Sequence, residues 1–101
     1  MEQAHQRWPE LVMAFEKRQP GQTFAVKTLF RDGERGEWMW VNISSIKRER
    51  VEGRLENKPA SVNNVREGNQ VTVKISEIGD WIYQDGKNLI GGFSLSPPKK
   101  A

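Results

Sequence analysis

The sequence contains no cysteine and only one histidine, His5. Without cysteine the chain can form no disulfide, and a lone histidine cannot build a zinc site. Packing and hydrogen bonds must therefore supply the whole net stability, which for domains is typically about 5–15 kcal/mol. At 101 residues the chain has the length of one domain, because two separate cores would each lie near the lower limit for independent folding.

Long apolar runs are also missing. No stretch approaches the roughly 20 residues that cross a bilayer. The first ten residues, MEQAHQRWPE, lack the hydrophobic stretch of a secretory signal. We therefore expect a cytoplasmic protein without membrane contact. The absence of cysteine agrees with this location, although many periplasmic proteins also lack disulfides.

A strong excess of one charge is lacking too. The chain has 16 basic and 13 acidic residues, and Lys99 and Lys100 supply two of the net +3 charges. Acidic and basic side chains interleave in the segment KRERVEGRLE at 47–56. Phosphate backbones favour a stripe of positive charge, so this pattern disfavours nucleic acid as a partner.

A helical pattern stands near the N-terminus. Its apolar residues recur at spacings of three and four: Trp8, Leu11, Val12 and Phe15. Pro9 suits the first helical turn, and Pro20 stops the helix. The spacing predicts a short helix over about residues 9–18 that packs through its apolar face.

From residue 23 the apolar period changes to two, which is the period of a strand with one buried face. Asp32-Gly33 and Asp85-Gly86 are hairpin signals. We expect residues 76–80 to form a short connection. The pattern predicts strands at residues 23–31, 37–46, 48–56, 70–75, 81–84 and 88–95.

These elements together predict an α+β fold in which the short N-terminal helix packs on a mostly antiparallel, strongly twisted sheet of about six strands. The domain should span residues 1–95. Residues 96–101, SPPKKA, have nothing to bury and contain two adjacent prolines, so we expect a flexible C-terminal tail.

Five short motifs follow one another along the chain: FAVK at 24–27, MWV at 39–41, Gly53 with Asn57 and Pro59, Asp80-Trp81 with Tyr83, and Gly91-Gly92-Phe93. In this order they resemble the YegJ-like bacterial family known as domain of unknown function 2314. The likeness spans about residues 4–95. It implies a compact bacterial α+β domain and carries no activity with it.

The first candidate surface contains Trp38. On a strand, Trp38 and Trp40 point to one face while Met39 points to the other, so both faces are apolar. Either the helix covers the second face, or Trp38 stays partly exposed as an anchor for a partner. Arg31 and Arg35 lie in or beside the adjacent hairpin loop and join this candidate surface.

The second candidate is Asp80 with Trp81 and Tyr83. In a structural interpretation, Asp80 caps a turn through backbone amides while the two rings fill the edge of the core. In a functional one, the rings line a ligand pocket with Asp80 as its polar group. Gly91-Gly92 predicts a bulge or a bend, since the pair lacks the spaced glycines and following helix of a phosphate cradle.

No catalytic group is predicted. Ser44 and Ser45 lie within a strand and His5 precedes the helix, which disfavours a catalytic triad. Glu77 with Asp80 could serve acid–base chemistry, but carboxylates near a turn are usually solvated or capping groups. We predict no metal ligand, no cofactor and no enzymatic activity.

The sequence therefore predicts a non-enzymatic protein-binding module. Its most specific form is a bacterial immunity protein that neutralises a cognate toxin by occluding the toxin's active site. The alternative is a small-molecule or single-stranded nucleic-acid binding domain that stacks its ligand on exposed aromatic rings. The oligomeric state stays open. The candidate partner-binding residues are Trp38, Arg31, Arg35, Asp80, Trp81 and Tyr83.

Overall fold

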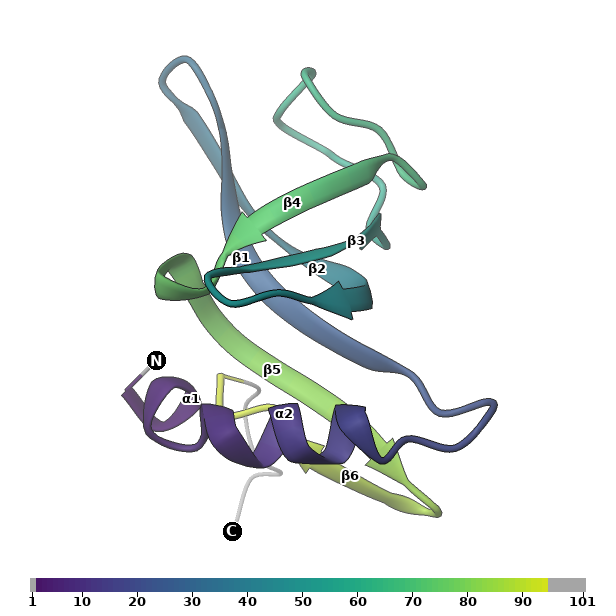
Figure 1. Ribbon diagram of the computed structural model, residues 1–101. Helices are drawn as coiled ribbons and strands as arrows, with labels where there is room; N and C mark the ends of the chain where they lie inside the picture. Colours follow the sequence, from purple (N-terminus) through teal and green to yellow (C-terminus); the bar gives the residue numbers. More distant parts are fainter. Residues whose placement is uncertain (1, 95–101) are drawn as a thin grey trace, which may run out of the picture.

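The computed structural model describes residues 2–94, which form two short helices and one six-stranded antiparallel sheet (Figure 1). This confirms the predicted α+β class. The predicted tail at 96–101 lies outside the described residues. The elements in chain order are α1 (Glu2–Gln6), α2 (Trp8–Glu16), β1 (Phe24–Asp32), β2 (Arg35–Ile46), β3 (Arg50–Leu55), β4 (Gln70–Lys74), the 3-10 turn η1 (Ile75–Glu77), β5 (Ile78–Asp85) and β6 (Asn88–Gly91).

The sheet coils strongly about itself. Its strand order is β4-β3-β2-β1-β5-β6, so three strands lie between β4 and β5 in the sheet. Along the chain, however, only the three residues of η1 join them. Such a short link requires the sheet to curl until the end of β4 lies close to the start of β5 (Figure 1). The concave face enclosed in this way contains the core.

The helices differ from the single predicted segment. Helix α2 ends at Glu16, two residues earlier than predicted, and α1 precedes it. The sequence of α1, EQAHQ, has no apolar stripe, so periodicity could not reveal it. Its buried residue is Ala4, which is 1% exposed. Tertiary contact with β5, described below, therefore holds this helix where its own sequence gives little support.

The strand boundaries differ most from the prediction at β5 and β6, and by one or two residues elsewhere. The predicted connection at 76–80 was wrong in part, because β5 already begins at Ile78. Four consecutive buried residues open this strand, so the alternation that marks the other strands is absent there. At the far end, β6 stops at Gly91 instead of continuing to residue 95. Gly91 and Gly92 have φ angles of +97° and +70° and turn the chain away from the sheet, which confirms the predicted bend.

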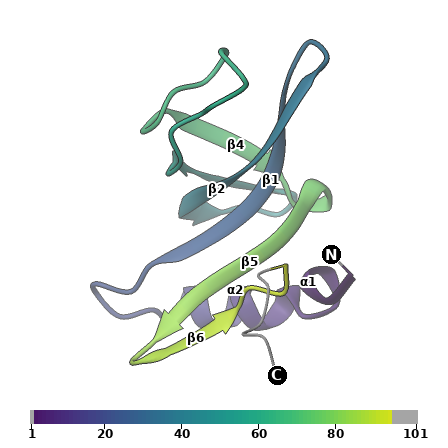
Figure 2. The ribbon, with the colours of Figure 1, turned by 180° about the vertical axis from the view of Figure 1, so that it is seen from behind.

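One face of the sheet packs against the helices. Phe15 of α2 meets Phe24 of β1 edge to face, with ring centroids 5.3 Å apart. Met39 and Val41 of β2 face the same core and are at most 1% exposed. Seen from behind, the helices lie beyond β5 and β6, and the opposite side of the sheet faces the viewer (Figure 2). We call this opposite side the open face.

Close packing at Gly91 yields a test of the bend. A Cβ atom built at Gly91 would lie 2.3 Å from the Trp81 carbonyl oxygen and 2.8 Å from its ring. Gly86, a matched control, also has positive φ but has nothing within 4 Å of its Cβ position. We expect Gly86→Ala to lower the free energy of unfolding by about 1–2 kcal/mol for its backbone conformation alone. Gly91→Ala should cost roughly 1–3 kcal/mol more, because the ring and carbonyl must move.

Urea denaturation of the two variants and the wild type measures this difference. Equal losses at Gly91 and Gly86 would show that the bend does not depend on contact with Trp81.

Candidate functional site

Asp80 is fully buried, and its carboxylate binds the chain's own backbone. One oxygen, Oδ1, accepts hydrogen bonds from the backbone N–H groups of Trp81 at 2.8 Å and Phe93 at 2.9 Å. The other, Oδ2, accepts from the Ser94 N–H at 2.8 Å and from the Ser94 hydroxyl. Hydrogen bonds to a charged acceptor are stronger than those between neutral groups. Asp80 therefore fastens the segment after β6 onto β5, as the structural interpretation expects.

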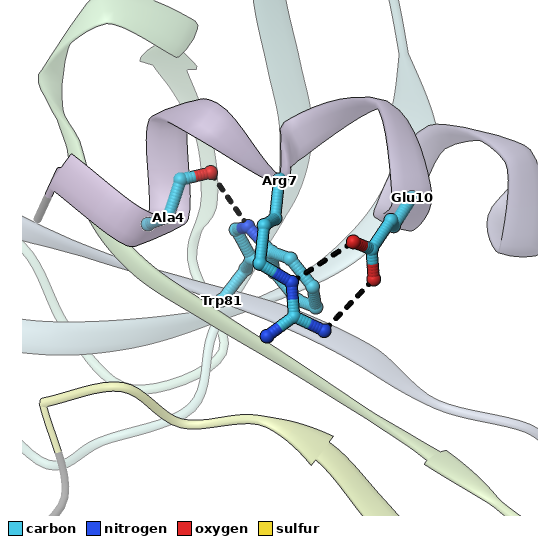
Figure 3. A network of polar contacts seen from close by, with 4 residues as sticks. All are labelled: Ala4, Arg7, Glu10 and Trp81. Carbon is cyan, nitrogen blue, oxygen red and sulfur yellow. Dashed lines mark hydrogen bonds and ion pairs between the residues drawn. The ribbon is translucent and has the colours of Figure 1, made fainter.

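Trp81, the residue after Asp80, connects helix α1 to β5 (Figure 3). Its ring is fully buried, and its indole Nε1 donates a hydrogen bond to the Ala4 carbonyl oxygen at 2.8 Å. The Phe93 ring packs edge to face on it, with centroids 5.1 Å apart. Tyr83 is only partly buried and stacks on Trp81 at a centroid distance of 6.0 Å. Asp80 and Trp81 thus expose no surface that a partner could contact.

An exposed ion pair borders this cluster. The Arg7 guanidinium donates two hydrogen bonds of 2.9 Å to the Glu10 carboxylate (Figure 3). These bonds hold the pKa of the Glu10 carboxyl below its usual value and raise the pKa of Arg7. The same guanidinium lies over the Phe93 ring at 5.1 Å. Because the pair is solvent-exposed, it contributes little to the stability of the fold.

Trp38 lies on the open face and is 43% exposed. Met39 packs in the same core as Leu11 and Phe15 of α2, and Trp38, its neighbour in β2, points to the opposite face, which the helices do not cover. Its cross-strand neighbour in β1 is Leu29. A shallow hollow of about 450 Å³ opens here, which we call the Trp38 hollow; it is lined by Thr28, Leu29, Arg31, Trp38 and Glu77. The structure therefore brings the predicted residues Trp38 and Arg31 together.

Trp40, two residues away, has different surroundings. It is partly buried, and the Lys27 ammonium lies over its ring at 5.7 Å. Lys27 also donates a hydrogen bond to the Ser94 hydroxyl at 3.3 Å. The chain therefore covers Trp40 with one of its own side chains, while Trp38 stays open to solvent.

Arg35, the third residue of this predicted surface, does not line the Trp38 hollow. Its guanidinium donates a hydrogen bond to the Ser61 carbonyl oxygen at 3.2 Å, in the long loop between β3 and β4. Beside it, Glu37 anchors the same loop, since one carboxylate oxygen accepts from the backbone N–H groups of Ala60 at 3.0 Å, Ser61 at 2.8 Å and Val62 at 3.3 Å. These bonds lower the pKa of the Glu37 carboxyl. No sequence signal singled out Glu37, because the partners are backbone groups more than 20 positions away.

The side chains considered for acid–base chemistry do not converge. His5 Nε2 is hydrogen-bonded to the Ile78 carbonyl oxygen at 2.7 Å, Asp80 binds backbone amides, and Glu77 lines the Trp38 hollow. Across residues 2–94, no group of three or more His, Cys, Asp or Glu side chains could hold a metal ion. None of the helices within that range is long and apolar enough to span a bilayer.

The fold and this geometry define a small α+β domain with one sheet face packed on helices and the other presenting a tryptophan. The chain belongs to the family DUF2314, described as an uncharacterized protein conserved in bacteria, whose model matches residues 1–99. This confirms the family resemblance inferred from the motifs.

Two relatives show how much of a longer protein this domain occupies. The chain is 33% identical over 75 residues to the uncharacterized protein YegJ of Escherichia coli K12, covering 74% of this chain and 49% of YegJ. It is also 33% identical over 69 residues to a putative ankyrin repeat protein of Neisseria meningitidis serogroup B, covering 65% of this chain and 27% of the relative. The chain thus spans half or less of each. No solved structure matches it.

The loop anchor at Glu37 predicts a specific pH dependence. A carboxyl whose pKa is lowered by folding stabilises the fold above its unfolded value near 4.5, and this stabilisation is lost as the pH falls through the folded pKa. In wild-type protein the Ser61 amide proton shift should titrate with a midpoint below 4.5, as measured by NMR. Glu37→Gln should abolish this step, while Glu34→Gln, in the exposed turn of the same hairpin, should leave it in place. A midpoint at or above 4.5 would contradict the anchor.

Proposed function

We propose that this domain is a non-enzymatic protein-binding module and that the open face around Trp38 is its contact surface. The observation that carries the proposal is the exposure of Trp38, 43%, on a face that the helices leave free. Tryptophan is among the residues that contribute most to binding energy at protein interfaces. A ring this large, left in water, is better explained by a partner than by the core.

The surroundings of Trp38 suit such an interface. Leu29 extends the apolar surface across to β1, and the Trp38 hollow gives a partner side chain a place to insert. Arg31 and Glu77 in the walls of the hollow supply charges of opposite sign. An apolar centre with a polar rim is the usual anatomy of a protein interface.

The most specific form of the proposal is a cytoplasmic immunity protein that occludes the active site of a cognate bacterial toxin. Its support is the small size, the mixed charge and the membership of a bacterial family. The relative named as a putative ankyrin repeat protein adds a further argument. Repeats of that kind stack into extended binding surfaces, so a similar domain placed beside them would fit a role in protein recognition.

Substitution of Trp38 tests the proposal. Tagged wild-type domain should capture a stoichiometric protein from a lysate of its own bacterium, and Trp38→Ser should lower the affinity for that protein about 30-fold or more. Met13→Ser is the control, since Met13 is 57% exposed on α2, on the helix-covered side of the sheet. Met13→Ser should change the free energy of unfolding by less than about 1 kcal/mol, whereas Trp38→Ser should lower it by roughly 1–3 kcal/mol, because more than half of the Trp38 ring is covered; both variants should still fold cooperatively in urea denaturation. Failure to capture any stoichiometric protein, or capture that Trp38→Ser leaves unchanged, would refute the proposal.

A single-stranded nucleic-acid or small-molecule ligand is the second candidate, favoured by the meeting of Trp38 with Arg31 in one hollow. Oligonucleotide titrations followed by tryptophan fluorescence at two salt concentrations distinguish it. Nucleic-acid binding should weaken steeply with salt and be lost in Trp38→Ser. Absence of any response at low salt would eliminate the nucleic-acid form of this candidate.

A further inference from the structure

Positive side chains face each other where β3 begins and β4 ends. In the register of these strands, Arg50 lies directly opposite Lys74. Both alternate with buried residues, so both side chains project from the exposed side of the strands. Like charges directly opposite one another destabilise a strand pair. The sheet therefore contains a repulsive pair that the fold itself does not require.

The chain's own carboxylates neutralise this region incompletely. Arg50 Nε lies 3.7 Å from Glu52, but the same carboxylate also lies 4.0 Å from Lys47 Nζ. Within residues 2–94, no carboxylate oxygen comes within 4.0 Å of the charged groups of Arg48 or Lys74. Positive charge thus remains unmatched at this end of the sheet.

A hollow gathers these charges. It has a volume of about 580 Å³ and is lined by Arg48, Glu49, Arg50, Lys74, Ile75 and Ser76. Three cations and one carboxylate give its wall a net charge of +2, and the Ser76 hydroxyl adds a neutral donor. We call it the β3–β4 hollow. None of its residues lines the Trp38 hollow.

We propose that the β3–β4 hollow binds a phosphate group. Arginine guanidinium groups bind phosphate oxygens in pairs, and lysine adds a compact charge. A phosphate monoester carries about −1.5 to −2 charges and three acceptor oxygens. It therefore matches three cationic side chains better than a carboxylate ligand, which carries a single charge. Placed between Arg50 and Lys74, it would convert their repulsion into attraction to a common anion.

Phosphate titration of the full chain tests the site. Inorganic phosphate is added at low ionic strength, with sodium chloride of equal ionic strength as the reference, and binding is followed by calorimetry. Lys74→Gln and Arg50→Gln should each weaken binding about tenfold or more, since each removes a charged donor. Arg54→Gln is the matched control: Arg54 lies on the same strand and the same face, but donates to the Gly68 carbonyl oxygen outside the hollow. Glu49→Gln should act in the opposite direction and tighten binding.

Thermal melting gives an independent signature. Without phosphate at low salt, Lys74→Gln should melt at the same temperature as wild type or higher, because it removes the repulsion. Phosphate should then raise the melting temperature of wild type and leave that of Lys74→Gln unchanged. A lower melting temperature for Lys74→Gln without phosphate would mean that Lys74 has an ordinary stabilising role, and would contradict the proposal.

A comparison of two probes identifies the source of the phosphate group. Binding of a phosphoserine peptide at least about tenfold tighter than that of inorganic phosphate would assign it to a modified protein. Equal or weaker binding of the peptide would assign it to a free or small-molecule phosphate. No binding of either probe above the chloride reference, or equal losses in Lys74→Gln and Arg54→Gln, would overturn the site. Because Trp38→Ser leaves this hollow intact, failure here and failure of the protein-binding proposal are distinguishable.

Discussion

The buried contact between Asp80-Trp81 on β5 and the two ends of the described chain is the constraint on which the rest of the structure depends. The Asp80 carboxylate holds the segment after β6, and the Trp81 indole holds α1 through the Ala4 carbonyl oxygen. Since the chain has no disulfide, these hydrogen bonds and the packing of the surrounding rings hold the two ends against β5. A buried carboxylate left without its amide partners would be costly, so Asp80 favours the arrangement in which the final turn lies against β5.

This constraint also divides the tryptophans into two kinds. The Trp81 ring is fully buried and its indole N–H is hydrogen-bonded to Ala4, and the Trp40 ring lies beneath the Lys27 ammonium. Trp38 has no comparable cover, because the helices are drawn to the opposite face by their contacts with β5. The exposed surface proposed for binding is therefore a consequence of where the helices are anchored. The β3–β4 hollow lies where β4 ends and η1 begins, and neither Asp80 nor Trp81 lines it.

Periodicity and turn signals were enough to predict the helix-plus-sheet class, the mostly antiparallel sheet and the bend at Gly91-Gly92. They failed where tertiary contact overrides local pattern: α1 has no apolar stripe, and β5 begins with buried residues on both faces. Trp38 and Arg31 could be grouped because they share one hairpin, whereas Glu37 could not be found, as its partners are distant backbone amides. Residues of different sequence motifs contact one another in the structure. The Phe93 N–H donates a hydrogen bond to Asp80, and the Trp40 N–H donates one to Asn57 at 2.7 Å.

Hydrogen exchange in Asp80→Asn tests the central constraint most directly, with Asp85→Asn, at the exposed end of β5, as the control. The amides of Phe93 and Ser94 and the indole N–H of Trp81 should lose protection in Asp80→Asn, whereas the amide of Val41, in a central strand, should keep most of its own. Asp85→Asn should change none of them. If Phe93, Ser94 and Trp81 stay as protected in Asp80→Asn as in the wild type, the carboxylate does not hold the two ends together and the account is contradicted.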